Sequence, residues 1–336
     1  MPKQIIFPCV NQAALIEVDP KVPAANEVVV KTEISTVSPG TERANITGDA
    51  NVAGRHAPEV KFPRSSGYNS AGVVESVGES VTSVAPGDRV VVYWGKHLSH
   101  NVVPEAQVVK LPDTVSFEEG ALSFIATFPL AAIRKTRLEM GESAMVMGLG
   151  LLGQIAVRLL RAAGAYPVIG VDPVASRREE ALAGGADYVF DPFEAGFADR
   201  IKAVTGGGAN VCIEVTGNGA GMDGALDCMA KFGRMALLGC TRDKNFNIDY
   251  YRKVHCPGIT LIGAHTNARP KEESHPGWFT HRDDINAVLK LIVGGRLDFK
   301  PMLTERYSPA ECAAVYERII NDRSFPTVAQ FDWNKI

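Results

Sequence analysis

Three glycines and one acidic residue have the spacing of a nucleotide-binding turn. Gly148, Gly150 and Gly153 follow the apolar run 143–147 and precede a run with helical spacing. The first glycine permits a tight turn, the second a close approach of the backbone to a pyrophosphate, and the third close packing of helix on strand. The helix N-terminus stabilises the negative charge. Asp172, which ends the next apolar run, can accept hydrogen bonds from ribose hydroxyls. The pattern therefore predicts NAD binding.

The flanking residues support this interpretation because strand and helix periods alternate. Apolar residues recur at helical spacing from Leu152 to Ala163, which predicts a helix with Arg158 and Arg161 facing solvent. Strands that alternate with helices are typical of a doubly wound parallel sheet. Six apolar runs are the expected strands: 143–147, 168–171, 187–190, 211–215, 235–239 and 260–263.

The two ends of the chain have a different pattern. The first part is β-rich, with short strands expected over 27–32 and 72–77 and turns between them. Ser116 and Glu119 have the spacing of a capping box that begins a helix. After residue 265 the alternation ends, and the remaining elements expected are a helix over 284–292, a second capping box at 308–311 and a strand over 327–331.

Composition and charge exclude several classes of partner. The chain is 46% hydrophobic and 22% charged, as in ordinary globular proteins, and its net charge of -3 predicts neither nucleic-acid nor membrane binding. Neither a signal-peptide core nor a membrane-spanning apolar run is found, so we expect a cytoplasmic protein. The six cysteines are widely spaced, which fits neither a disulfide framework nor a zinc knuckle. We expect most of them to pack in the core. For Cys240, which follows a predicted strand end at Leu238 and Gly239, core packing is favoured and a place in the cofactor site is the alternative.

Together these motifs resemble the medium-chain dehydrogenase/reductase superfamily over essentially the whole chain. The resemblance rests on residues 87–90 (GDRV), 109–113 (VKLPD) and 148–172. Residues 38–43 (SPGTER) and 67–72 (GYNSAG) are further similar to a zinc-lacking subgroup, the dehydrogenase half of bi-domain oxidoreductases of sugar and polysaccharide metabolism.

The resemblance implies an α/β fold with two domains. A GroES-like, β-rich catalytic domain would comprise residues 1–122 and 265–336. A Rossmann domain with a doubly wound, six-stranded parallel sheet would comprise residues 123–264. Such members usually pair through the edge strand of the Rossmann sheet, here 260–263, so we expect a homodimer or homotetramer.

The positions at which zinc-dependent members hold their metal carry other residues here. The resemblance places a cysteine at Pro39, a His-Glu pair at Tyr68 and Asn69, and a third ligand near Ser123. None of these side chains supplies a thiolate or an imidazole. The four-cysteine structural zinc lobe is also missing, because no cysteine lies between residues 10 and 211. The sequence therefore predicts a zinc-independent enzyme with no metal site.

Without zinc, a side chain must handle the proton that accompanies hydride transfer. Tyr68 occupies the position of a lost ligand, and its phenol pKa of about 10 would have to be lowered by a cation such as Lys96 or a histidine. The resemblance matches Thr41 to a proton-relay hydroxyl and Glu42 to a carboxylate that supports a metal ligand. The candidate catalytic residues are Tyr68, Thr41, Glu42, Lys96 and His97; a purely space-filling role for Tyr68 stays open.

Further site residues follow from the resemblance. It places the aromatic and polar loop 93–100 at the border of the active-site cleft, where it would suit a hydroxyl-rich substrate; a solvated loop is the alternative. It places residues 265–269 beside the nicotinamide and 275–278 near the cleft. The residues expected to bind the cofactor are Gly148, Gly150, Leu151, Leu152, Gly153, Asp172, Arg177, Thr216, Leu238, Gly239, Cys240, Ala264 and His265.

The expected function is that of an NAD-dependent oxidoreductase acting on a small secondary alcohol or ketone, such as a sugar or polyol. The carboxylate of Asp172 would repel a 2′-phosphate, which favours NAD over NADP, although Arg177 and Arg178 lie downstream. Three alternatives stay open. They are an NADPH-dependent reductase of activated C=C bonds, a zinc-dependent alcohol dehydrogenase with non-standard ligands, and an NAD-binding protein without catalysis.

Overall fold

The chain folds into two compact units. The computed structural model describes residues 1–52, 59–240, 245–322 and 324–336. The first unit comprises Met1–Phe124 and Ile285–Ile336, and the second comprises Ile125–Asp284. The divisions fall within helices α2 (Phe117–Thr136) and α7 (His281–Val293). Residues 265–284 lie in the second unit; the predicted domains, which group them with the first part of the chain, stay a prediction.

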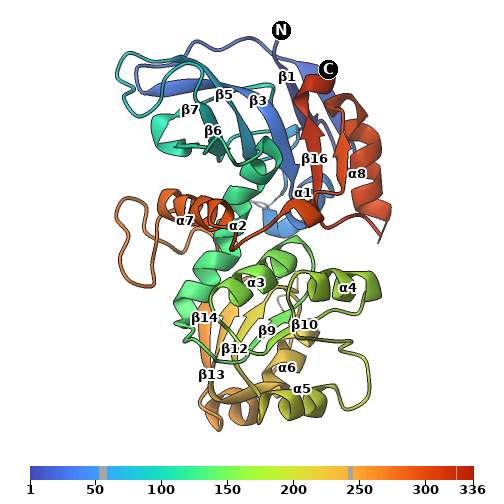
Figure 1. The fold of residues 1–336 in the computed structure, drawn as a ribbon. Coiled ribbons are helices and arrows are strands. Elements are labelled where there is room, and N and C mark those ends of the chain that lie inside the picture. Colours follow the sequence, from blue (N-terminus) through green and yellow to red (C-terminus); the bar gives the residue numbers. More distant parts are fainter. Residues whose placement is uncertain (53–58, 241–244, 323) are drawn as a thin grey trace. The chain divides into compact units, whose positions relative to one another are not determined.

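The first unit is built on a seven-stranded sheet and a three-stranded sheet (Figure 1). The larger sheet has the order β15-β16-β3-β5-β6-β8, with β7 also paired to β3, and the smaller has the order β2-β1-β4. Their strands are β1 (Lys3–Phe7), β2 (Ala14–Glu17), β3 (Glu27–Val37), β4 (Arg64–Ser65), β5 (Asn69–Val77), β6 (Arg89–Tyr93), β7 (His100–Pro104), β8 (Val108–Lys110), β15 (Glu305–Tyr307) and β16 (Ala329–Asp332).

Short helices complete this unit: α1 (Pro39–Ile46), α8 (Cys312–Asn321) and the single turns η1 (Ala50–Val52), η2 (Glu105–Gln107), η4 (Lys300–Met302), η5 (Pro309–Glu311) and η6 (Trp333–Lys335). Strand β3 pairs with β5 on one side and with β16 on the other, so the last strand of the chain is in the same sheet as the first long one. Tyr316 of α8 and Phe331 of β16 pack with Phe7 in one apolar core. The C-terminal segment is therefore part of the β-rich unit.

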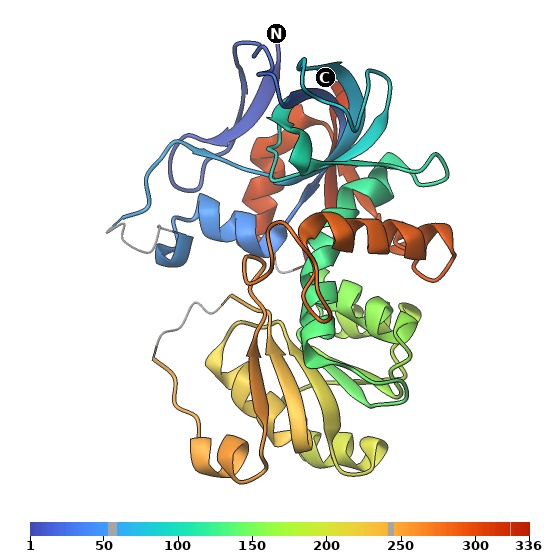
Figure 2. The ribbon, with the colours of Figure 1, turned by 90° about the vertical axis from the view of Figure 1, so that its left-hand side faces the viewer.

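The second unit is the predicted six-stranded parallel sheet, with the order β11-β10-β9-β12-β13-β14 (Figure 2). Its strands are β9 (Ala144–Met147), β10 (Val168–Val171), β11 (Tyr188–Phe190), β12 (Ala209–Glu214), β13 (Met229–Leu237) and β14 (Thr260–Gly263). Its helices are α3 (Leu151–Ala162), α4 (Ala175–Ala183), α5 (Phe197–Thr205), α6 (Gly219–Asp227) and the π-helical turn η3 (Tyr251–His255). The α/β fold class is confirmed, and each predicted strand overlaps an observed one, although β13 begins at Met229 rather than at the predicted residue 235.

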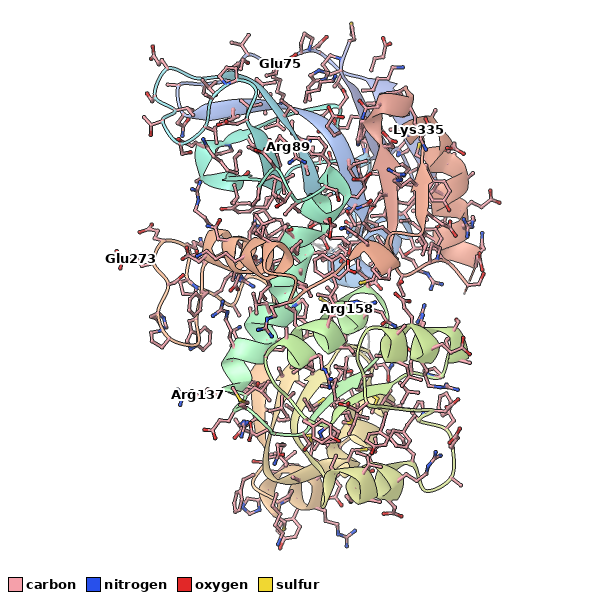
Figure 3. All side chains as sticks on the ribbon, viewed as in Figure 1. Glu75, Arg89, Arg137, Arg158, Glu273 and Lys335 are labelled. Carbon is pink, nitrogen blue, oxygen red and sulfur yellow. The ribbon has the colours of Figure 1, made fainter. Side chains whose placement is uncertain are left out.

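One prediction about helix α3 is wrong. Arg161 is exposed, but Arg158, labelled in Figure 3, is only 7% exposed. Its guanidinium donates to the carbonyl of Gln154 (3.1 Å) and occupies the space beside Gly184. Helical periodicity predicts that Arg158 faces solvent. In the structure Gly184, at the end of α4, has no side chain, which leaves room for the long side chain of Arg158.

The predicted helix caps are present. The backbone N–H of Glu119 donates to the Ser116 hydroxyl (3.2 Å) at the start of α2, and Ser308 forms a full capping box with Glu311. Helix α7 begins before its predicted first residue because the Thr280 hydroxyl accepts from the N–H of Asp283 (3.2 Å).

The cysteine prediction holds only in part. Cys212, Cys228 and Cys312 are buried, whereas Cys9, Cys240 and Cys256 are exposed. Cys240 is at the surface because it lies in the loop after β13, where the chain leaves the sheet. Among the described residues, no helix combines the length and the apolarity needed to cross a bilayer.

Candidate functional site

The glycine turn of the second unit has the geometry that its sequence predicts. Gly148 has a φ of +99°, in the region that glycine tolerates best. A Cβ on Gly153 would lie 1.9 Å from the carbonyl oxygen of Gly148, so α3 packs on the turn too closely for any side chain there. A Cβ on Gly150, the N-cap of α3, would meet nothing within 4 Å, and no side chain caps this helix. The turn and the uncapped N–H groups fit the phosphates of a dinucleotide.

Asp172 is already engaged by the protein. It is 4% exposed, and its carboxylate accepts from the N–H of Leu149 (2.8 Å) and of Val174 (2.8 Å). Arg177 lies 3.7 Å from the same carboxylate and is partly exposed. Asp172 therefore fastens the glycine turn to the end of β10, and a carboxylate with several acceptor positions can still accept from a ribose hydroxyl.

Glu214, at the end of β12, is a site residue that sequence reasoning missed. It is 3% exposed, and one carboxylate oxygen accepts from the N–H of Thr216 (2.8 Å), from the Thr216 hydroxyl and from the N–H of Gly217 (3.3 Å). Its backbone carbonyl accepts from the N–H groups of Leu238 and Gly239, both at 2.9 Å. Burial raises the pKa of Glu214, and the hydrogen bonds from Thr216 and Gly217 oppose that shift. Glu214 thus joins the loops after β12 and β13.

The signal that could have found Glu214 is a carboxylate at the end of an apolar strand, separated by one residue from a Thr-Gly pair. The loops after β12 and β13 also pack closely on each other, because a Cβ on Gly239 would lie 2.4 Å from the backbone N of Gly217. Thr216 is also next to the glycine turn: its Cγ2 would be 3.1 Å from a Cβ on Gly148. The ends of the central strands therefore form one hydrogen-bonded cluster.

The remaining predicted cofactor residues lie at the same end of the sheet, beyond the carboxyl ends of its parallel strands. Leu151 and Leu152 begin α3, and Leu238, Gly239 and Cys240 follow β13. Ala264 is buried after β14, with its N–H donated to the Leu237 carbonyl (3.1 Å). His265 is exposed, and its Nδ1 accepts from the N–H of Asn267 (3.2 Å). Their roles in binding stay predictions.

In the first unit, Tyr68 lies in polar surroundings. Burial raises the pKa of its phenol to about 12. Hydrogen bonding with Ser38 and Thr41 acts in the opposite direction, and the negative charge of Glu42 adds to the increase. Among the described residues no cation contributes to this shift, whereas the sequence-based hypothesis requires a cation that lowers the pKa. The side chain of Lys96 is exposed, and His97 faces Glu42 instead.

Asn69 and three aromatic rings lie around Tyr68. Asn69 is 1% exposed, and within the described residues neither its amide nitrogen nor its amide oxygen has a partner with good hydrogen-bond geometry. The ring of Tyr68 is 5.8 Å from that of Trp94 and 6.0 Å from that of Phe124, and Tyr93 also packs on Phe124. Trp94 is 39% exposed and has a φ of +59°, unusual for a bulky residue. Its N–H donates to the Tyr68 carbonyl (3.0 Å), which holds this backbone.

Glu42 and His97 form a buried pair rather than surface groups. His97 is 0% exposed and Glu42 is 2% exposed, and Nε2 of His97 lies 3.2 Å from both carboxylate oxygens. The structure thus brings together Tyr68, Thr41 and Glu42, with His97 behind Glu42 and Lys96 on the outside. Their roles in catalysis stay predictions.

The positions at which the sequence resemblance expects zinc ligands carry side chains that do not suit zinc. Pro39 is the first residue of α1, and the hydroxyl of the buried Ser123 donates to the Glu119 carbonyl (3.2 Å). Tyr68 and Asn69 supply a phenol and an amide. Within the described ranges, no three His, Cys, Asp or Glu side chains gather in a group that could hold a metal ion.

Comparison with known proteins identifies the family. An "Alcohol dehydrogenase GroES-like domain" model matches residues 24–117, and a "Zinc-binding dehydrogenase" model matches residues 152–276. L-threonine 3-dehydrogenase of Pyrococcus abyssi (strain GE5 / Orsay) is 30% identical over 328 residues, 88% of this chain and 88% of that protein. The chain belongs to the medium-chain dehydrogenase/reductase superfamily. It is an alcohol-dehydrogenase-like oxidoreductase of the type named zinc-binding dehydrogenase, as the sequence motifs predicted.

D-guloside 3-dehydrogenase of Escherichia coli (strain K12) is another relative within this superfamily, 27% identical over 330 residues, 91% of this chain and 94% of that protein. Two solved structures share the fold. A zinc-binding dehydrogenase from Sinorhizobium meliloti 1021 bound to NADP has a TM-score of 0.80 at 20% identity, with 99% of both chains covered. An alcohol dehydrogenase from E. coli CFT073 complexed with NADH has a TM-score of 0.83 at 17% identity, with 99% of both chains covered. Proteins of this fold therefore bind either nucleotide.

The Glu214 cluster predicts a specific mutational effect. Glu214→Ala removes the acceptor of three donors on Thr216 and Gly217, and we expect it to weaken NADH binding by about tenfold, equivalent to about 1.4 kcal/mol. Glu214→Gln keeps one acceptor oxygen and should bind NADH within about threefold of the wild type. Fluorescence titration measures both affinities, and circular dichroism checks folding. A folded Ala variant with wild-type affinity would contradict the role of Glu214.

Proposed function

We propose that this protein is an NAD-dependent, zinc-independent oxidoreductase that interconverts a secondary alcohol and a ketone on a small sugar or polyol. The observation that carries the proposal is the phenol of Tyr68. The sequence resemblance places it at the position of a family zinc ligand, and it is half-buried and hydrogen bonds with Ser38 and Thr41. A neutral phenol can donate a hydrogen bond to an oxygen on which negative charge develops.

The glycine turn supports a nicotinamide nucleotide as the partner in hydride transfer. When bound, the nucleotide would supply or accept the hydride. The chain's own part is to bind the pyrophosphate at the N-terminus of α3, where Gly150 leaves open space, and to hold the turn in place through Asp172. Glu214 holds the loops after β12 and β13, so the carboxyl ends of the strands are organised before the nucleotide binds.

The first unit supplies the proton-handling group. Because burial keeps the pKa of Tyr68 at about 12, the phenol is neutral at physiological pH and acts as a donor rather than a resident base. In the reduction direction its O–H bond breaks as the ketone oxygen takes the proton, and the phenolate then regains a proton from water. In the oxidation direction the proton moves the opposite way. These steps need no metal, in keeping with the residues at positions 39, 68, 69 and 123.

The surroundings of Tyr68 support a hydroxyl-rich substrate. Trp94 is 39% exposed beside Tyr68, and an indole face can stack on the C–H face of a sugar ring. The buried amide of Asn69 hydrogen bonds with the Tyr68 phenol and has further donor and acceptor capacity for a second hydroxyl group. The name of the relative D-guloside 3-dehydrogenase also indicates a sugar substrate for that protein. For an activated C=C bond, this set of polar groups has no evident use.

Substitution of Tyr68 tests the proton-handling role. We expect Tyr68→Phe to lower kcat by about 10²-fold or more, because general acid–base catalysis contributes on that order. Tyr250→Phe, at a tyrosine that is 65% exposed, serves as the control and should keep the wild-type rate. The substrate for the assay comes from a turnover screen over sugars, polyols and enones. An unchanged rate in Tyr68→Phe would move the proton-handling role to another group.

Metal analysis of the purified protein tests zinc independence. Stoichiometric zinc that a chelator removes together with activity would overturn the hypothesis of a zinc-independent enzyme.

Asp172 supports NAD over NADP, because a 2′-phosphate would meet its carboxylate. We expect NADH to bind more tightly than NADPH in fluorescence titrations. Asp172→Asn keeps an acceptor for the N–H of Leu149 but removes the charge, so it should shift the ratio of dissociation constants toward NADPH by about three- to tenfold. Arg177→Ala removes the neighbouring cation and should shift the ratio further toward NADH. Tighter binding of NADPH by the wild type would refute the cofactor assignment.

We also propose a homodimer or homotetramer that forms through β14. This strand is at one end of the sheet order, carries no charged residue and exposes 37% of Leu261, whereas unpaired edge strands are usually protected by charges. A lysine on the edge opposes pairing, so Leu261→Lys should lower the mass measured by light scattering. Leu182→Lys on α4, at a residue that is 45% exposed, is the matched control. A monomeric wild type would disprove this assembly.

The cytoplasmic location stays a prediction.

A further inference from the structure

The carboxylate of Glu42 is buried in the first unit, where it has three partners. It lies in the first turn of α1 and is 2% exposed. One oxygen accepts from the N–H of Ser38 (2.8 Å), the other accepts from the Tyr316 hydroxyl, and Nε2 of His97 is 3.2 Å from both. A buried carboxylate without partners would be strongly destabilising, so this convergence of donors is what allows an anion here.

His97, one of the partners of Glu42, is itself hydrogen bonded on its opposite side. Nδ1 of His97 is 2.7 Å from the Ser35 hydroxyl, and that hydroxyl accepts from the indole N–H of Trp333 (2.9 Å). Because the Ser35 oxygen already accepts, its own O–H is available to donate to Nδ1. A Ser35 O–H that donates to Nδ1 leaves the N–H of His97 on Nε2, where it faces Glu42. The cluster therefore brings Ser38, Tyr316 and His97 to one carboxylate.

Glu42 is also connected to Tyr68. Ser38 precedes α1 and Thr41 lies in its first turn, and both hydrogen bond with the phenol of Tyr68. Glu42 holds Ser38 through the backbone N–H, so the same carboxylate fixes the turn that presents both hydroxyls. Among the described residues, Glu42 is the charged group that acts on the phenol, and its negative charge opposes ionisation of the phenol.

We infer that Glu42 is a positioning residue for Tyr68: fastened by Ser38, His97 and Tyr316, it fixes the turn beside the phenol and keeps the phenol a neutral hydrogen-bond donor. This inference rests on the proposed function for its catalytic consequence. Family members with zinc use a carboxylate near this position to support a metal ligand. Here the carboxylate acts on a phenol, and its negative charge favours the protonated form.

The charge effect can be measured without turnover. Replacing Tyr68 with a difluorotyrosine gives a single fluorine NMR signal, and its more acidic phenol titrates at a pH that the fold tolerates. We expect Glu42→Gln, which keeps the shape and one acceptor oxygen, to lower the pKa of this phenol by about one unit. Glu79→Gln, at an exposed carboxylate of the same unit, should leave it unchanged.

A second variant separates charge from packing. Tyr316→Phe removes one donor but keeps the Glu42 charge, so the phenol should titrate at or above its pH in the parent protein. If Glu42→Gln leaves the titration unchanged, or if Tyr316→Phe lowers it as well, the inference is wrong. If Glu42→Gln does not fold, the Tyr316→Phe result decides alone. Because no measurement here uses catalysis, an unchanged rate in the Tyr68→Phe test would move the proton-handling role to another group and leave the measured effect of Glu42 on the phenol standing.

Discussion

An ionised carboxylate can remain inside a protein only where several hydrogen-bond donors meet it, and this constraint organises the first unit. Glu42 lies on α1, near the start of the chain, but its donor Tyr316 is on α8, near the end. His97 joins it from the segment between β6 and β7. Three distant segments must therefore be in place before the charge is satisfied. The interaction makes the turn that carries Ser38 and Thr41 depend on the fold of the whole unit.

The second unit meets the same constraint with backbone donors. Asp172 and Glu214 are each at the carboxyl end of a parallel strand, and each accepts from the N–H groups of a turn. The Asp172 carboxylate ties β10 to the loop after the neighbouring strand β9, and Glu214 holds its own loop through its carboxylate and the loop after β13 through its backbone carbonyl. Such ends are where open α/β sheets bind ligands, since the loops there are positioned by a rigid sheet. The acids that hold these loops are therefore part of the binding surface even where they face inward.

In the proposed mechanism a phenol takes the place of a metal, so one fold would host a different chemistry. The positions that the sequence resemblance assigns to zinc ligands carry Pro39, Tyr68, Asn69 and Ser123. What a zinc ion does as a Lewis acid, the half-buried phenol would do as a hydrogen-bond donor. The supporting carboxylate at position 42 is present, but its partners are His97 and Tyr316.

The sequence by itself determined the sheet of the second unit, the glycine turn and the family, because these depend on short-range patterns. Hydrophobic period, capping residues and a Gly-x-Gly-x-x-Gly turn are all local, and the structure confirms them at β9, α3 and α8. It also determined that the zinc positions carry no thiolate or imidazole.

Only the tertiary structure decided what the polar side chains face. Arg158 is beneath Gly184 rather than in solvent, Cys240 is exposed rather than buried, and His97 faces Glu42 rather than Tyr68. Each outcome depends on a residue far along the chain or on a neighbouring element, which no local period encodes. The direction of the Tyr68 pKa shift follows the same rule, because burial and the charge of Glu42 exist only once the chain has folded.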